Sequence, residues 1–440
     1  MSGLLEFASR LVQAGWLSLL DYLAAHVLLC LVPAFFIAGA LSALIPKETV
    51  TRYLGPRASR IVSYPAAALG GFVLAVCSCT ILPLFAGIWK RGAGLGPAIT
   101  FLFVGPAVNI LAIAYTGAAI GMDIALARIV LSMVFGITIG FLMASLFRDS
   151  ETTADEGLFS GETRVKPATW AFFTMLIALL IAGTLKVDLL SRTWVSISIP
   201  ISVPLSLLTA LQEMQLTVQG LLLIGLLILI GVAAQLGLQD ILERISGWTY
   251  ATLGLVVVTM LVAAPTVLPG GSVTVGITGR FVSIAVLLVA LGLAAWRGLE
   301  RPQIQSWLWE TWRFAKQIFP LLVVGVFAAG MVKELIPAEW IRTLAGRNTL
   351  LANLFGVLFG VFMYFPTLVE VPIARTFLEL GMHRGPLLAY LLADPELSVQ
   401  SILVTSNILG RRRTAVYVAL VTVFTTLAGW LFGLTVLTLA

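Results

Sequence analysis

Long apolar stretches separated by short polar segments occupy most of the chain. A membrane-spanning helix needs about 20 predominantly apolar residues, and about twelve stretches approach or exceed that length. The pattern predicts an all-α polytopic membrane protein with about 10–12 transmembrane segments. The apolar stretches are residues 23–45, 61–89, 96–120, 124–147, 168–190, 217–236, 249–267, 281–296, 314–336, 350–380, 386–409 and 415–437.

Two of these stretches, 61–89 and 350–380, have lengths that a single straight helix does not explain. At about 1.5 Å per residue each would run roughly 45 Å, which is too long for one span and too short for two. Pro83 interrupts the first stretch, and Pro366 and Pro372 interrupt the second. We therefore predict Pro/Gly-broken helices here, either a span followed by a half-helix or two half-helices.

A different pattern appears between residues 194 and 205, where Val, Ile and Leu alternate with Ser and Pro. A period of two indicates extended backbone, and Pro200 and Pro204 exclude a central strand. Because an open strand edge cannot face lipid, we place this segment outside the membrane or at its surface. It is either a connecting loop or a cap over a transport pathway.

Glycine and proline recur in the same order near the two ends of the chain. These residues dictate backbone shape, so the duplicated feature is a way of breaking helices. We predict a first membrane repeat over residues 1–147, a polar loop over 148–167, middle helices over 168–312 and a second membrane repeat over 313–440. Inverted repeats are favoured because segments of this length suit hairpins of short helices, and parallel repeats stay open. The matching positions are Gly55 and Gly346, Pro83 and Pro372, Gly92 and Gly381, Gly96-Pro97 and Gly385-Pro386, and Pro106 and Pro395.

The composition excludes most other classes of protein. The chain is 59% hydrophobic and 11% charged, whereas soluble proteins are roughly 25% charged. Soluble enzymes, nucleic-acid binders and secreted disulfide scaffolds are excluded on this ground. We assign the net charge of +6 to loops that anchor the protein at the membrane surface. No zinc-protease or Walker A motif occurs, and we expect no enzyme activity, catalytic residue, metal or cofactor.

The motif Cys77-Ser78-Cys79, followed by Pro83, is the sharpest local feature. Thiols two residues apart point about 200° away from each other on an ideal helix and converge only if the backbone unwinds. Pro83 favours unwinding because it removes the amide that would bond the Cys79 carbonyl. Converged thiols suit a thiophilic solute such as trivalent arsenic or Cu(I), or form a reducible disulfide. The alternative is a small residue that allows close helix packing.

Two further groups of residues lie at breaks within apolar segments. Gly105-Pro106, with Asn109 nearby, frees backbone groups at membrane depth and predicts part of a substrate pathway, or alternatively a kinked helix. Glu370, Asp394 and Glu396 are carboxylates beside prolines, and such residues in membrane spans point to proton coupling. The alternatives for the carboxylates are ion pairing with Arg375 or an interfacial location.

The motifs C-S-C-T-I-L-P, K-R-G-A-G-L-G-P-A and G-P-A-V-N-I lie between Cys77 and Asn109, and V-E-V-P, L-G-M-H-R-G-P and D-P-E-L-S lie between Val369 and Arg413. With these motifs the chain resembles the predicted permease family that includes organoarsenical efflux permeases. The resemblance implies a multi-span permease of the cell inner membrane with two related halves. The second half departs from the first, because it lacks the paired cysteines and has Asp394 where the first has Gly105. By carry-over from the family, the residues that line the central site are Cys77, Cys79, Pro83, Gly105, Pro106 and Asn109, and we include Ser78 between the thiols.

We therefore expect a secondary transporter that exports a small thiophilic or anionic solute, such as a metalloid or organoarsenical. The expected partners are this small-molecule substrate and the lipid bilayer, and assembly into a homo-oligomer stays open. The competing hypothesis is a membrane redox protein that uses Cys77 and Cys79 with a thioredoxin-like partner.

Overall fold

A computed structural model gives the architecture of the chain, and it divides into two compact units that we describe separately. The first unit combines residues 1–16, 47–161 and 318–440, and the second combines residues 17–46 and 162–317. The structure describes residues 2–25, 29, 31–45, 47–56, 58–74, 78–108, 110–147, 167–184, 190, 192–199, 217–268, 273–334, 338–362 and 370–439.

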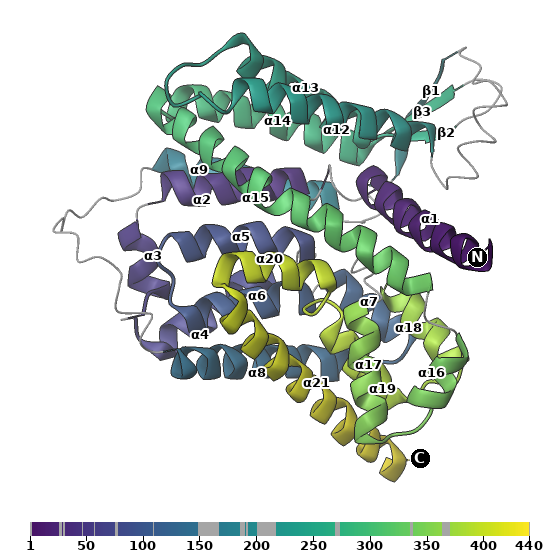
Figure 1. Cartoon of the computed structure of the whole chain (residues 1–440). Helices are drawn as coiled ribbons and strands as arrows, with labels where there is room; N and C mark the ends of the chain where they lie inside the picture. The colour runs from purple at the N-terminus through teal and green to yellow at the C-terminus, as the bar shows by residue number, and fades with distance from the viewer. Residues whose placement is uncertain are drawn as a thin grey trace. The chain divides into compact units, whose positions relative to one another are not determined.

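The first unit contains two sets of helices from opposite ends of the sequence (Figure 1). One set consists of α3 (Lys47–Leu54), α4 (Arg60–Leu74), α5 (Ser78–Lys90), α6 (Leu95–Ala107), α7 (Ile110–Ala119) and α8 (Met122–Leu146). The other consists of α16 (Ala338–Ala345), α17 (Leu350–Phe362), α18 (Glu370–Glu379), α19 (Arg384–Ala393), α20 (Val399–Leu409) and α21 (Arg411–Leu439). Two long helices, α1 (Ser2–Ala25) and α15 (Arg301–Glu334), belong to both units.

The two sets use the same packing. In one set α6 packs against both α4 and α8, and in the other α19 packs against both α17 and α21. Glycine makes the closest approach in each case. A Cβ atom placed on Gly140 of α8 would lie 2.6 Å from the Gly96 carbonyl oxygen, and one on Gly429 of α21 would lie 2.6 Å from the Gly385 carbonyl oxygen. These helices therefore meet backbone to backbone, as small residues allow in membranes.

The connections between the helices also correspond. Gly92 joins α5 to α6 with a φ of 87°, and Gly381 joins α18 to α19 with a φ of 95°. Both angles lie in the left-handed region that glycine adopts without strain. The boundaries and relative orientation of the proposed repeats stay predictions.

The prediction of broken helices is confirmed. The stretch 61–89 contains α4 and α5, and the stretch 350–380 contains α17 and α18. One expectation about the break is wrong: Pro83 lies inside α5, and α5 begins at Ser78, so the backbone at Cys79 is helical. Pro83 lies beyond the first turn of α5, so the helix continues through it although the Cys79 carbonyl loses its usual amide partner.

Two further stretches that look like single spans in the sequence are also broken. The chain from residue 95 to residue 119 forms α6 and α7, with α6 ending directly after Pro106. The chain from 384 to 409 forms α19 and α20, with Pro395 in the turn between them. Four pairs of short helices are therefore present in the first unit.

The second unit has a helical core and a small sheet. Its helices are α2 (Val32–Leu44), α9 (Pro167–Thr184), α12 (Val218–Gly237), α13 (Gly247–Ala263) and α14 (Gly279–Gly298), together with the first part of α15. Leu179 of α9, Met260 of α13 and Ile284 of α14 pack in one buried cluster. The Trp307 indole of α15 donates a hydrogen bond of 2.8 Å to the Phe36 carbonyl of α2. Apolar packing and this bond fix α15 against α2.

The sheet contains β1 (Thr193–Ile199), β2 (Thr266–Leu268) and β3 (Val273–Thr278) in the order β1-β3-β2, with both pairs antiparallel. Strand β1 covers the first part of the alternating segment and lies at an edge of the sheet. Its remainder, from residue 200 onward, lies outside the described residues. The sequence did not predict β2 and β3, because β2 overlaps the end of the apolar stretch 249–267 and β3 follows shortly after it.

The helices identify a polytopic membrane protein. Within the described residues, six helices are long and apolar enough to cross a membrane. Their outer faces carry exposed apolar side chains, such as Ile228 of α12 and Val286 of α14, which suit contact with lipid rather than water. The six are Met122–Leu146, Pro167–Thr184, Val218–Gly237, Gly279–Gly298, Arg301–Met331 and Arg411–Thr435.

Candidate functional site

A fully buried ion pair lies inside the first unit. Arg128 of α8 pairs through Nη2 with the Glu370 carboxylate, and both side chains have 0% exposure. Arg128 Nε also donates a hydrogen bond of 3.2 Å to the Ala107 carbonyl at the end of α6. The pair joins residues that are far apart in the sequence, from one set of helices to the other. Such a pair inside a membrane domain is costly unless both charges are well compensated.

The ion pair lies where several short helices begin or end. Glu370 is the first residue of α18, where the positive end of the helix dipole favours a carboxylate. Ala107 is the last residue of α6, and α18 packs against α7, which follows it. The equivalent helices also cross, since α20 packs against α5. Helix ends leave backbone amides and carbonyls available for ligands, as in transporters whose sites lie between half-helices.

Two more buried carboxyls surround the pair. Asp394 directly follows α19, and its carboxyl lies near that of Glu370. Glu396 lies in the next turn, and its Oε2 accepts a hydrogen bond of 3.0 Å from the Tyr417 hydroxyl of α21. Asp394 is 0% exposed and Glu396 is 4% exposed. We call Arg128, Glu370, Asp394 and Glu396 the buried charge cluster.

The balance of the buried charge cluster determines what it can bind. One guanidinium faces three carboxyls, so the cluster would carry two uncompensated negative charges if every carboxyl were ionised. Such charges are expensive to bury, and carboxyls in this position take up protons or attract a cation. The cluster can therefore exchange protons whenever water reaches it.

Polar groups without partners lie next to the cluster. Within the described part of the chain, the buried hydroxyls of Ser132 and Tyr390 and the Nη1 atom of Arg128 have no hydrogen-bond partner. Ser132 follows Arg128 by one helical turn and lies on the same face of α8. Among the described residues, no group of three or more His, Cys, Asp or Glu is placed to hold a metal ion.

The structure brings the three predicted proton-coupling residues together and corrects one alternative for Glu370, the ion pair with Arg375. Arg375 does not pair with Glu370; its Nε contacts Glu379 at 3.2 Å, where both side chains are more than half exposed. The side chain of Glu370 is completely buried and does not lie at an exposed surface. The partner of Glu370 is Arg128.

The predicted substrate-binding residues are described only in part. Cys77 and Asn109 lie outside the described residues, and Ser78 and Cys79 form the start of α5 without described side chains. Pro83, Gly105 and Pro106 are buried. Gly105 is closely packed: a Cβ atom on it would lie 2.6 Å from the Ile81 side chain of α5. The role of these residues in substrate binding stays a prediction.

Arg128 was not among the residues predicted from the sequence, although the sequence carries a signal for it. Arg128 lies within the apolar stretch 124–147, and an arginine inside a span is by default a functional residue with a partner to be found. Tyr390 and Tyr417 gave no comparable signal, because tyrosine is common in apolar segments. Their closeness to the carboxyls follows only from the packing of α19 and α21.

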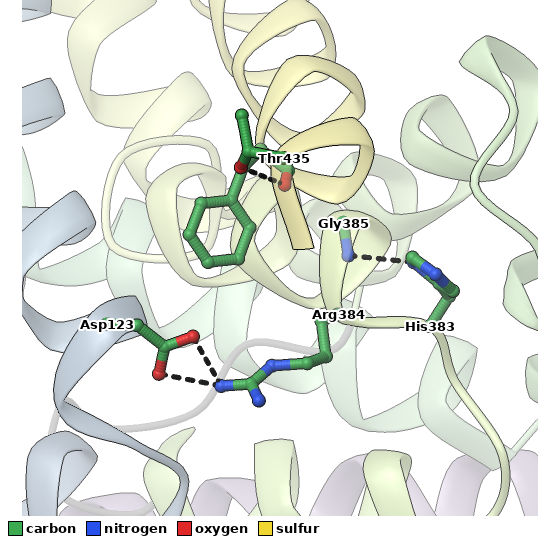
Figure 2. A network of polar contacts seen from close by, with 6 residues as sticks. Asp123, His383, Arg384, Gly385 and Thr435 are labelled. Atoms are coloured by element: carbon green, nitrogen blue, oxygen red, sulfur yellow. Dashed lines mark hydrogen bonds and ion pairs between the residues drawn. The ribbon is translucent and has the colours of Figure 1, made fainter. Parts of the chain in front are cut away.

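A second ion pair between the two sets of helices is exposed (Figure 2). Arg384 Nη2 at the start of α19 lies 2.7 Å from each carboxylate oxygen of Asp123 in α8. Beside it, burial and the nearby Arg384 charge lower the pKa of His383. A neutral imidazole is required here, because His383 Nδ1 accepts a hydrogen bond of 3.2 Å from the Gly385 amide.

The amino-acid sequence matches the model of the predicted permease family (ArsP_1) over residues 13–434. The chain belongs to this family. The permease is 32% identical to UPF0718 protein MJ0584 of Methanocaldococcus jannaschii over 432 residues, which cover 98% of each chain. It is 26% identical to UPF0718 protein YraQ of Escherichia coli over 200 residues, which cover 41% of the permease and 56% of that relative. No solved structure matches the permease significantly.

Membership of this family fits the architecture described above. A permease carries a small molecule across the bilayer, and broken helices such as those of the first unit are typical of transporter binding sites. The permease is therefore a membrane transporter, and the buried charge cluster is its candidate functional site.

Proposed function

We propose that the permease is a proton-coupled secondary transporter of the cell inner membrane that exports a small thiophilic or anionic solute, such as a metalloid or organoarsenical. The observation that carries this proposal is the buried pair of Arg128 and Glu370 at the meeting point of the short helices. Ionisable residues inside membrane domains mark substrate pathways and proton relays.

Uptake or release of a proton changes the charge balance of the buried charge cluster. When Glu370 takes up a proton, its attraction to Arg128 weakens and the guanidinium becomes free to bind another acceptor. When the proton leaves, the ion pair forms again. An ion pair that breaks and re-forms between two sets of helices is a two-state element, and a proton gradient biases such an element by binding one state better.

The solute would bind to polar groups at the cluster that have no hydrogen-bond partner among the described residues. Arg128 Nη1 and the Ser132 hydroxyl can donate hydrogen bonds to an oxygen atom of the solute. Helix α5, whose first turn contains Cys79, packs against α20. Helix α20 follows the turn that holds Asp394 and Glu396. A soft solute held by thiols would therefore lie near the carboxyls that supply the protons.

We expect Glu370→Gln to reduce transport driven by a pH gradient by about 100-fold, a typical loss when a group that transfers protons is removed. Glutamine keeps the shape and a hydrogen-bond acceptor for Arg128 but cannot be protonated in the working range. The measurement is uptake of trivalent methylarsenical into everted membrane vesicles with an imposed pH gradient.

The matched control for this experiment is Glu379→Gln, which removes a carboxylate of the same helix from the exposed pair with Arg375. Its transport should equal that of the wild type. Gradient-driven transport that survives Glu370→Gln would remove Glu370 from the proton pathway.

The thiophilic part of the proposal has its own test. We expect Cys77→Ser combined with Cys79→Ser to abolish resistance of sensitive cells to trivalent arsenicals, because serine oxygen is a poor ligand for soft elements. Cys30→Ser is the control, since Cys30 lies in a different apolar stretch of the sequence, residues 23–45. Full resistance in the double variant, with equal amounts of protein in the membrane, would rule out a thiol contact with the solute.

A further inference from the structure

A pocket of about 300 Å³ opens in the first unit, away from the buried charge cluster. It lies between the start of α4, the start of α6 and the last turns of α8, three helices that pack against one another. The residues that define its chemistry are Arg60, Ser63 and Tyr64 of α4, Gly94 before α6, and Phe141 and Ser145 of α8.

The polar groups in the pocket suit an anion. The Arg60 guanidinium lies 5.1 Å from the centre of the Phe141 ring, which holds the cation at the rim. Ser63 is 2% exposed, and its side chain adds a hydroxyl to the lining of the pocket. Gly94 precedes α6 without a side-chain cap, so the positive end of this helix also borders the pocket. No described residue that lines the pocket is acidic.

The surroundings of the pocket suit lipid. Ile61 of α4 is 86% exposed and Leu146 of α8 is 60% exposed, and both lie next to residues that line the pocket. At the same end of the unit, Arg413 lies 5.8 Å from the Trp89 ring and 6.0 Å from the Phe147 ring. Cations placed against aromatic rings beside exposed apolar helices are typical of the membrane interface.

The other set of helices provides an internal comparison. The corresponding place, at the start of α19 beside α21, is filled by Asn348, whose amide donates a hydrogen bond of 3.0 Å to the Trp430 carbonyl. Asn348 Oδ1 also accepts a hydrogen bond of 3.0 Å from Asn353. The same packing is therefore closed by a hydrogen-bonded side chain in one set and left open, with a cation and a hydroxyl in the lining, in the other.

We propose that this pocket binds the headgroup of an anionic phospholipid. The lipid phosphate would accept hydrogen bonds from the Arg60 guanidinium and the Ser63 hydroxyl, and the acyl chains would follow the exposed faces of α4 and α8. The proposal concerns a site separate from the transport pathway and does not depend on the solute or on proton coupling.

The test measures lipid binding to the purified full-length permease in detergent, with phosphatidylglycerol and phosphatidylcholine as probes and thermal stability and native mass spectrometry as readouts. We expect phosphatidylglycerol to remain bound and to raise the unfolding temperature, with little effect of phosphatidylcholine. Arg60→Gln should weaken phosphatidylglycerol binding by about tenfold or more, as expected for loss of a charge-assisted hydrogen bond.

Two further variants make the result specific. Arg52→Gln removes an exposed cation that lies over the Tyr53 ring in the preceding helix α3, and it should bind phosphatidylglycerol as the wild type does. Ser145→Phe places a ring in the pocket without changing its charge, and it should lose the lipid as Arg60→Gln does.

Three results would overturn the proposal. They are unchanged phosphatidylglycerol binding in both Arg60→Gln and Ser145→Phe, an equal loss in Arg52→Gln, and displacement of the lipid by millimolar inorganic phosphate. The last result would assign the pocket to a free phosphate ion instead of a lipid. Because every readout is lipid binding or unfolding, a failure here leaves the transport proposal untouched, and the reverse also holds.

Discussion

Arg128→Met will destabilise the permease by about 3–5 kcal/mol, because it leaves the Glu370 carboxylate buried without its counter-charge. Methionine fills a similar volume but cannot compensate the charge or bond the Ala107 carbonyl. The variant should also lose transport. The measurements are thermal unfolding of the purified protein in detergent and resistance of the cells that express it.

Combining Arg128→Met with Glu370→Gln separates folding from function. The double variant removes both charges together, so most of the lost stability should return. Transport should stay absent, because neither the guanidinium nor the exchangeable proton is present.

The matched control is Arg384→Met, which removes an arginine from the exposed pair with Asp123. Exposed pairs contribute about 0–1 kcal/mol, so this variant should unfold close to the wild-type temperature. If Arg128→Met proved as stable as Arg384→Met, burial of the central ion pair would be incorrect.

Gly140→Leu will prevent the first set of helices from packing. A Cβ atom at this position would lie 2.3 Å from the Thr100 hydroxyl oxygen and 2.6 Å from the Gly96 carbonyl oxygen, so α6 and α8 would have to separate. Overpacking of one methylene costs about 1–3 kcal/mol, and a larger side chain against backbone should cost more. We expect little folded protein in the membrane by fluorescence-detected size-exclusion chromatography.

Gly254→Leu is the control for Gly140→Leu, since nothing lies within 4 Å of a Cβ atom on Gly254 of α13. Leucine there should be neutral or slightly stabilising, because glycine is a poor helix former. Equal amounts of folded protein from the two variants would contradict the close approach of α6 and α8.

Much of the fold follows from the sequence because the relevant signals are local. The lengths of the apolar stretches and the positions of Pro83 and Pro372 were enough to predict broken helices. The position of each break was harder to predict. Pro83 lies inside α5 rather than at its start, so the helix continues through the proline and the break comes before Ser78.

The sequence was enough to predict which carboxylates belong to the candidate site, but it was not enough to predict which residue pairs with Glu370. Glu370, Asp394 and Glu396 stood out as carboxylates in apolar segments, and their burial agrees with that reading. Arg375 is the nearest arginine to Glu370 in the sequence, yet the partner is Arg128, which another helix supplies. The partner is determined by tertiary packing, and no local sequence pattern identifies it.

The two sets of helices share a packing scheme but differ at its most important contact. Gly92 and Gly381 occupy equivalent turns, and the same difference in residue number separates Arg128 from Tyr417 and Ala107 from Glu396. Arg128 donates to the Ala107 carbonyl, and Tyr417 donates to the Glu396 carboxylate, so one contact is made twice with different chemistry. The guanidinium belongs to one set of helices and the three buried carboxyls belong to the other. A conformational change that moved the two sets apart would therefore separate opposite charges inside the protein and would cost free energy.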